Sequence, residues 1–179
     1  MDTKTLKRIV GIASIVLGVL VLVMAFFAAV TTGGDNPSTY SGFNLIFGKK
    51  VTDLSVSLGS LVSAETKINF CFGLLLAYFL PVVAAVLLLL VVFGKSKGLS
   101  FVFGCVAFGC FVASIILLAC TKNMATWTST GSVAILGSSS TSGHFDTYDL
   151  GIGSILAIVC AGLGACTSGT FTVLQFLKK

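Results

Sequence analysis

The residues from Leu150 to Phe176 read LGIGSILAIVCAGLGACTSGTFTVLQF and include no Asp, Glu, Lys or Arg. The same is true of three further stretches: Ile9 to Val30, Phe70 to Phe93 and Leu99 to Cys120. Each reaches the ~20 residues that a helix needs to cross a hydrocarbon layer of about 30 Å. An ordinary soluble enzyme is excluded, because only 9% of the 179 residues are charged, whereas soluble domains are about 25% charged.

The sequence therefore predicts an all-α membrane protein, with residues 1–179 forming a single integral membrane domain. We expect a bundle of four transmembrane helices at about 9–30, 70–93, 99–120 and 150–176. Outer loops are expected at 31–69 and 121–149, and a cytoplasmic turn at 94–98. The turn is so short that the second and third helices must be antiparallel neighbours. The first stretch is longer than the ~7–15 apolar residues of a secretory signal, so we expect an uncleaved helix.

The basic residues predict the orientation of the helices. Seven of the eleven flank one side of the expected bundle: Lys4, Lys7, Arg8, Lys95, Lys97, Lys178 and Lys179. By the positive-inside rule both termini then face the cytoplasm, in a multi-pass protein of the plasma membrane. The net charge of +5 thus indicates the lipid bilayer as a partner and gives no reason to expect nucleic acid.

The first outer segment carries signals for short strands. Leu54, Val56 and Leu58 alternate with serines, and the run SGFNLIFG at 41–48 contains a glycine near each end. Both patterns are typical of strands. Residues 61–69 fit an outward extension of the second helix.

In the second outer segment, Trp127 and the run at 133–136 indicate further strands, and the run GSSSTSG at 137–143 indicates a flexible tip. Because an isolated hairpin is marginal in water, we expect the two outer segments to form one small extracellular antiparallel β-sheet on the helix ends.

Small residues spaced by four predict where the helices pack, because close approach drives helix association in a bilayer. The candidate helix-packing residues are Gly153, Ala157, Ala161, Ala165 and Gly169 in the fourth helix, Gly73 and Ala77 in the second, and Gly109 in the third. Pro81 is the candidate kink of the second helix, since its ring removes a donor and crowds the carbonyl of residue 77. A static kink and a hinge are the two interpretations.

The four apolar stretches contain no ionisable Asp, Glu, Lys, Arg or His, which disfavours a pump or a coupled transporter. The one histidine, His144, lies near Asp146 and Asp149. We interpret Asp149 as the cap of a helix that begins at Leu150, rather than as part of a metal or catalytic site. The sequence predicts no catalytic residue, metal or cofactor. All six cysteines fall in predicted helices, and Cys71 and Cys120 belong at outer ends, where adjacent helices would let them pair.

The predicted order of elements resembles the layout of claudin-like tetraspan proteins. It has four helices with cytoplasmic ends, a longer first outer segment with strand patterning, a tight inner turn and a shorter second outer segment. The resemblance covers nearly the whole chain and is one of topology. That family's first outer segment carries a Gly-Leu-Trp run and a cysteine pair, whereas residues 31–69 contain neither Trp nor Cys. Junction formation is therefore not carried over.

These observations predict a non-enzymatic membrane protein that contacts another membrane protein, or a second copy of itself, through its outer loops. The candidate contact residues are Phe43, Phe47 and Trp127. No small-molecule substrate is evident. The alternative is an auxiliary subunit of a transporter or channel complex, suggested by the small-residue stripe on the fourth helix.

Overall fold

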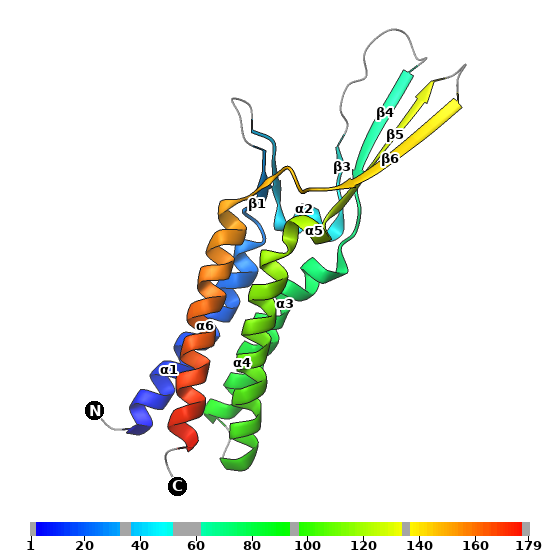
Figure 1. The fold of residues 1–179 in the computed structure, drawn as a ribbon. Helices are drawn as coiled ribbons and strands as arrows, with labels where there is room; N and C mark the ends of the chain where they lie inside the picture. The colour runs from blue at the N-terminus through cyan, green and yellow to red at the C-terminus, as the bar shows by residue number, and fades with distance from the viewer. Residues whose placement is uncertain (1–2, 33–36, 52–61, 94–96, 134–136, 177–179) are drawn as a thin grey trace.

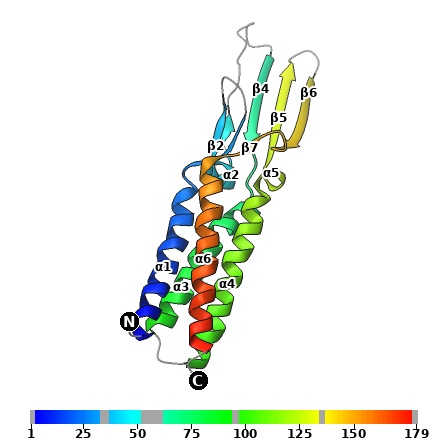
Figure 2. The ribbon, with the colours of Figure 1, turned by 60° about the vertical axis from the view of Figure 1, so that its left-hand side comes forward.

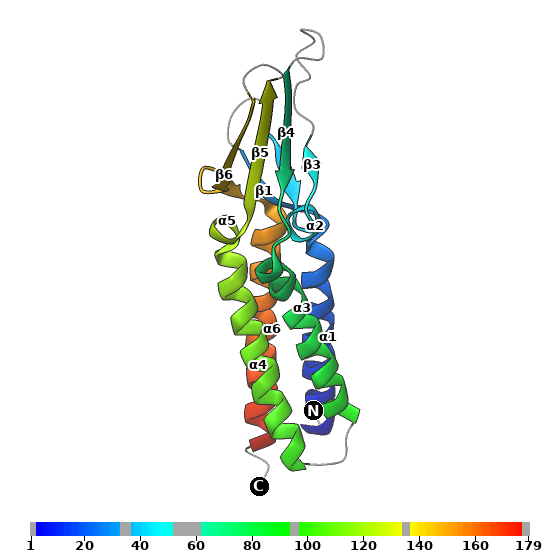
Figure 3. The ribbon, with the colours of Figure 1, turned by 90° about the vertical axis from the view of Figure 1, so that its right-hand side faces the viewer.

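The computed structural model describes residues 3–32, 37–51, 62–93, 97–133 and 137–176. In this part of the chain, four long helices form a bundle, and the strands gather at one end of it (Figure 1). The long helices are α1 (Thr3–Met24), α3 (Phe72–Phe93), α4 (Lys97–Ala119) and α6 (Ile152–Phe176). Two short helices, α2 (Gly42–Phe47) and α5 (Thr121–Met124), lie between the bundle and the strands. Both chain termini lie at the other end of the bundle (Figure 3).

Three of the helices are long and apolar enough to cross a membrane. The qualifying segments are Phe72–Val92, Ser100–Ala119 and Ile152–Leu174. The apolar part of α1, Arg8–Met24, is shorter. Along all four helices, large apolar side chains such as Val16, Leu90, Ile116 and Val159 point outward. The predictions of helices in the second, third and fourth apolar stretches are therefore confirmed.

The first helix ends six residues earlier than expected, at Met24 rather than Val30. The chain leaves the helix through a tight turn, in which the Phe27 N–H donates to the Met24 carbonyl at 3.1 Å. It then forms strand β1 (Ala28–Thr31). The fourth helix also begins later than predicted, because Asp149–Leu150 pairs with β1 as strand β7. Apolar composition alone does not separate a helix end from a buried strand.

Each long helix packs on two neighbours, in the ring order α1, α3, α4, α6. Figure 2 shows α6 in front, between α1 and α4. On its α1 side, a Cβ built on Gly153 would lie 2.9 Å from the Met24 carbonyl oxygen. On its α4 side, a Cβ built on Gly164 would lie 2.5 Å from Cε1 of Phe111. The small residues of α6 therefore let both neighbours approach closely.

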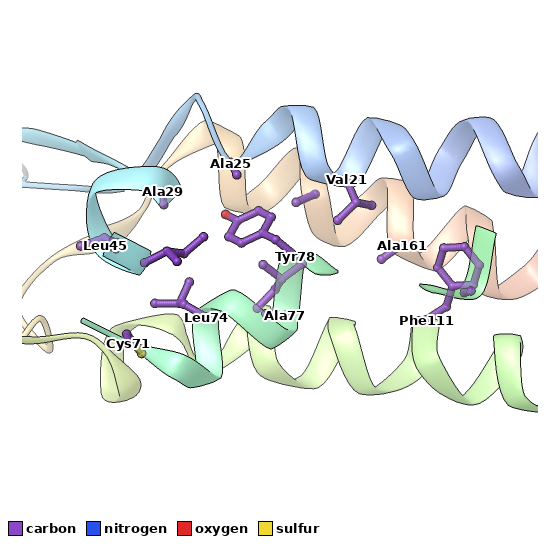
Figure 4. Packing of buried hydrophobic residues seen from close by; sticks show 14 of the residues in the cluster. Val21, Ala25, Ala29, Leu45, Cys71, Leu74, Ala77, Tyr78, Phe111 and Ala161 are labelled. Carbon is purple, nitrogen blue, oxygen red and sulfur yellow. The ribbon is translucent and has the colours of Figure 1, made fainter. Parts of the chain in front are cut away.

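The structure places most of the candidate packing residues inside the bundle. Ala157, Ala161 and Ala165 of α6 are buried, as is Ala77 of α3, and Figure 4 shows Ala77 and Ala161 in the interior. Gly153, at the start of α6, is buried as well, and the remaining three candidates lie elsewhere. Gly169 is half-buried beside Phe108, Gly73 lies under the Met124 side chain of α5, and Gly109 is exposed with nothing within 4 Å of a built Cβ.

The expectation that Gly109 packs inside the bundle is therefore wrong. The four-residue spacing that suggested it also occurs on the outward face of a membrane helix, where small residues are common.

Pro81 is buried in the middle of α3, which stays helical through it. Proline has no N–H, so the Ala77 carbonyl loses its usual donor four residues on. In the structure, the Ser114 hydroxyl of α4 donates to this carbonyl at 2.6 Å. A neighbouring helix thus satisfies the group that the proline leaves free. On the other side of α3, a Cβ built on Gly18 would lie 2.5 Å from the Pro81 carbonyl oxygen, so Gly18 lets α1 pass close to the proline.

The strands form two antiparallel sheets, where the sequence predicted one. The three-stranded sheet has the order β2-β1-β7, and the four-stranded sheet has the order β3-β4-β5-β6. Their bounds are β1 (Ala28–Thr31), β2 (Thr39–Ser41), β3 (Lys50–Val51), β4 (Val62–Ile68), β5 (Thr126–Val133), β6 (Gly137–His144) and β7 (Asp149–Leu150). Both sheets combine strands from the two outer segments, as expected.

Three local predictions in the outer segments are wrong. Residues 42–47 form helix α2 instead of a strand, because the Ser41 hydroxyl accepts the Asn44 N–H and Gly48 ends the helix at φ 79°. Residues 62–68 form strand β4 rather than extending the helix, and they pair along their whole length with β5. Residues 137–143 form most of strand β6 rather than a flexible tip.

Two further strand predictions concern residues partly or wholly outside the described ranges. Leu54, Val56 and Leu58 lie outside them, as do residues 134–136 of the run at 133–136. Val133 itself is the last residue of β5.

The contact between Ser114 and Ala77 predicts a specific coupling with Pro81. Ser114→Ala should lower the free energy of unfolding by about 1 kcal/mol, as for other buried interhelical hydrogen bonds. In a Pro81→Ala background the new N–H can donate to the Ala77 carbonyl, so the same change should have little effect. A double-mutant cycle on denaturant unfolding in one detergent measures the difference. An equal loss in both backgrounds would contradict this account.

Candidate functional site

Backbone contacts near the starts of α6 and α3 hold the segments around the sheets to the bundle. The Gly151 N–H donates to the Ala29 carbonyl at 2.8 Å, which continues the pairing of β7 with β1. A Cβ on Gly151 would collide with the Ala28 carbonyl, so only glycine allows this approach. On the opposite side, the Cys71 N–H donates to the Ile46 carbonyl at 3.1 Å and ties α2 to the segment just before α3. The bases of both sheets are therefore fixed by the helix ends.

Between the two sheets, close to the helix ends, lies a pocket of about 190 Å³. We call it the aromatic pocket. Its lining residues are Tyr40, Val51, Thr66, Ile68, Trp127, Phe145 and Tyr148. They come from β2, β3, β4, β5 and the segment between β6 and β7. Four of the seven side chains are aromatic, and none carries a formal charge.

Three of the rings meet at steep angles on one side of the pocket. Phe145 and Tyr148 are edge-to-face, with ring centroids 4.9 Å apart, and Tyr40 and Phe145 are edge-to-face at 5.8 Å. Tyr40 and Tyr148 are tilted at 6.1 Å. Phe145 is buried, and both tyrosines are half-buried. These are favourable aromatic geometries, so the three rings position one another.

Trp127, on β5, is the fourth aromatic ring of the pocket. Two contacts fix the position of its side chain. Its indole Nε1–H donates to the His144 carbonyl at 3.2 Å. Its ring covers Gly143, the residue opposite it on β6, where a built Cβ would lie 3.0 Å from Cζ2. Gly143 therefore leaves room for the indole to lie across the strand.

The charged residues of β3 and β4 lie on the face of the sheet away from the pocket. Lys50 and Lys67 alternate with the lining residues Val51, Thr66 and Ile68, and alternate residues of a strand point to opposite faces. Lys50 pairs with Glu65 across β3 and β4 at 2.8 Å, and both side chains are exposed. The hydrogen bond from Lys50, with the attraction between the two charges, lowers the pKa of Glu65 and raises that of Lys50.

The structure separates Trp127 from the other two candidate contact residues. Phe43 and Phe47 project outward from α2 and lie together, with ring centroids 4.6 Å apart. Phe26, just after α1, stacks on Phe43 at 5.6 Å. These three exposed rings form an apolar cluster where the bundle ends, whereas Trp127 lines the aromatic pocket.

The other residues considered for chemistry are not brought together. His144 is exposed at the end of β6, and the described residues contain no group of three His, Cys, Asp or Glu side chains that could hold a metal. Asp149 lies in β7 and not at the start of α6, so its interpretation as a helix cap is wrong. All six cysteines lie in the described ranges and are free thiols, and the Cys71 thiol donates to the Met124 carbonyl at 3.3 Å.

Sequence reasoning missed the three residues that form one side of the pocket. Phe145 and Tyr148 lie in a segment whose histidine and two acidic residues indicate other chemistry. Tyr40 lies far from both in the chain. The one available signal was the concentration of aromatic residues in HFDTYD at 144–149. It did not indicate that Tyr40 would lie beside them.

No protein-family model, curated protein or solved structure matches this chain. An uncharged aromatic pocket with a few hydroxyl groups is suited to binding a small ligand by ring contacts, and the side chains that line it include no nucleophile paired with a base.

Gly143 and Gly131 provide a matched pair to test how Trp127 is placed. Gly143→Val would put methyl groups into the indole, so Trp127 should move outward, and its fluorescence emission should shift to longer wavelength. Gly131→Val is the control, because a Cβ there meets nothing within 4 Å, and its emission should match the parent. Trp127 is the only tryptophan, so the signal has one source. An unshifted spectrum for Gly143→Val would contradict the observed packing.

Proposed function

We propose that this is a non-enzymatic integral membrane protein whose two sheets lie outside the plasma membrane and bind another protein. The observation that carries the proposal is the uncharged edge of the four-stranded sheet, presented on a bundle whose long helices contain no Asp, Glu, Lys, Arg or His away from their ends. The order of elements also supports a claudin-like layout, without that family's activity.

The length of α1 and its place in the bundle support a fourth span. Its apolar part, Arg8–Met24, is at the lower end of the range of about 17–25 residues that cross a bilayer. It packs between α3 and α6 along the bundle and has outward apolar side chains like theirs. Phe26 and Phe27 continue this apolar surface beyond its end.

The distribution of basic residues supports cytoplasmic termini. Both termini lie at the end of the bundle away from the sheets, and so do the end of α3 and the start of α4 (Figure 1). In the sequence, seven of the eleven basic residues fall within or next to these segments. The positive-inside rule then assigns this end to the cytoplasm and the sheets to the exterior.

The hydroxyl groups inside the helices support a structural role rather than a transport role. Ser14 of α1 donates to Thr167 of α6 at 2.7 Å, and Thr172 donates to the Ser168 carbonyl at 2.9 Å. With Ser114, these groups connect helices or satisfy backbone carbonyls. Transport pathways instead use intramembrane Asp, Glu, Lys, Arg or His, and the described long helices have none of these between their ends.

Strand β6 supports protein binding through its edge. It is the last strand of its sheet, so within the described ranges its outer edge pairs with no strand. Its sequence GSSSTSGH lacks Lys, Pro and acidic residues, and its pairing with β5 is regular along all eight positions. Natural edge strands are usually protected by such residues or by bulges. An unprotected edge is suited to adding a strand from a partner.

The alternative of an auxiliary subunit now depends on a different helix. The stripe on α6 is occupied by α1 and α4 and does not offer a free surface. Cys105 and Gly109 of α4 are exposed and spaced by four, the pattern that lets a second helix approach closely. This pair favours lateral docking against another membrane protein as the second candidate function.

The orientation predicts which positions are labelled on intact cells. A membrane-impermeant maleimide should react with Ser139→Cys in β6 and should fail to react with Ser96→Cys between α3 and α4 until the cells are opened. The parent, with its six native cysteines, sets the background. Labelling of Ser96→Cys on intact cells would contradict the orientation.

The edge of β6 predicts that added charge blocks binding. The double variant Ser138→Lys, Ser140→Lys places two lysines on the exposed strand without removing a backbone donor. Affinity capture from mild detergent should recover a stoichiometric partner, or a second copy, with the parent and at least tenfold less with this variant. Threonine at the same two positions is the control and should retain the partner. Equal recovery with the lysine variant, or no partner with the parent, would contradict the proposal.

A further inference from the structure

The aromatic pocket is small and is lined mainly by aromatic rings. Four rings, from Tyr40, Trp127, Phe145 and Tyr148, line about 190 Å³, together with two aliphatic side chains and the Thr66 hydroxyl. The Thr66 hydroxyl already donates to Ser129 at 3.1 Å. Pockets for drug-sized ligands measure about 300–1,000 Å³. The aromatic pocket therefore suits one compact group.

The ring arrangement determines which compact group fits best. Ring faces carry partial negative charge, and a cation held near several faces is attracted by each of them. Phe145 stands at a steep angle to both Tyr40 and Tyr148, so their faces have different directions. Trp127, the strongest cation-binding ring type, approaches from the other sheet.

The side chains that line the pocket include no positive charge that would repel a cation. Neither Lys50 nor Lys67 lines the pocket, and both alternate away from it along their strands. Lys50 is in addition paired with Glu65. Asp146 and Asp149 follow Phe145 and Tyr148 directly in the chain, and both are exposed. A positively charged group in the pocket thus lies among aromatic side chains and meets no lining ammonium group.

We propose that the aromatic pocket binds a quaternary ammonium group. Such a cation is poorly hydrated and has no N–H, so it gains from ring contacts and needs no hydrogen-bond acceptor. The group can belong to a free molecule such as choline or to the head group of a choline lipid. Both sources present the same trimethylammonium chemistry at the base of the sheets. The proposal concerns a small ligand and does not depend on the protein partner of β6.

Choline titration of the purified protein tests the proposal directly, because Trp127 is both a wall of the pocket and the only tryptophan. The protein is kept in a maltoside detergent, which contains no quaternary ammonium group. Choline should change the Trp127 fluorescence in a saturable way. The matched probe 3,3-dimethylbutan-1-ol has the same shape without the charge and should bind at least tenfold more weakly. Equal binding of the two probes, or no saturable change with choline, would overturn the proposal.

Variants of Tyr148 separate ring contacts from general stability. Tyr148→Phe keeps the ring face and should bind choline as the parent does, whereas Tyr148→Leu should bind about tenfold more weakly. Phe43→Leu removes an exposed ring outside the pocket and should change nothing. The Trp127 emission of each variant without ligand shows whether the pocket is intact. Unchanged choline affinity in an intact Tyr148→Leu protein would overturn the proposal.

Nanodiscs distinguish the two sources of the group. In discs of phosphatidylglycerol, which lacks a quaternary ammonium group, added choline should give the full Trp127 response. If the lipid head group is the natural ligand, discs of phosphatidylcholine should already give this response and leave little for added choline. If the ligand is a free molecule, the choline titration should be the same in both discs. Absence of a choline response in the phosphatidylglycerol discs would contradict binding from either source.

Discussion

The close approach of α6 to α1 and α4 is the contact on which the rest of the structure depends. Glycine and alanine on α6 let the backbone of α1 and the Phe111 ring of α4 come near. Dispersion between these surfaces replaces the hydrophobic effect that is missing between helices in lipid. The same approach continues at the start of the helix, where Gly153 in its first turn and Gly151 just before it lie against Met24 and Ala28. The position of β1, and through it the three-stranded sheet, is therefore set by how closely α1 and α6 pack.

The second constraint is that every buried backbone group needs a partner. Pro81 removes one donor inside the bundle, and Ser114 supplies another from the next helix. At the helix ends, the first outer segment pairs with the second, so both sheets contain strands from each segment. The aromatic pocket lies where these sheets meet and takes residues from both. It is thus a consequence of long-range pairing, and its geometry depends on the bundle below it.

The sequence predicts the long helices well because a long apolar stretch without charged residues is typical of a membrane-spanning helix. It also predicts that the outer segments pair, since neither segment is stable alone. It fails where the deciding contact is distant in the chain. Residues 62–68 and 137–143 become strands because β5 pairs with both, although helix and turn were reasonable local interpretations. Helix α2 is predictable from the sequence, since Ser41 and Gly48 are ordinary start and stop signals of a helix. The pocket is not predictable from the sequence, because Tyr40 and Phe145 come close together only in the folded chain.

The most direct test of the central role of α6 is the stability of Ala161→Leu in one fixed detergent. Ala161 is buried in the bundle, beside Phe111 in Figure 4, so a larger side chain must separate the helices and should lower the free energy of unfolding by about 1–3 kcal/mol. Cys166→Leu adds volume on the exposed face of the same helix and should have little effect. The Trp127 emission should change in the same transition as the helical signal, because the sheets depend on the bundle. An Ala161→Leu protein as stable as the parent would contradict the account.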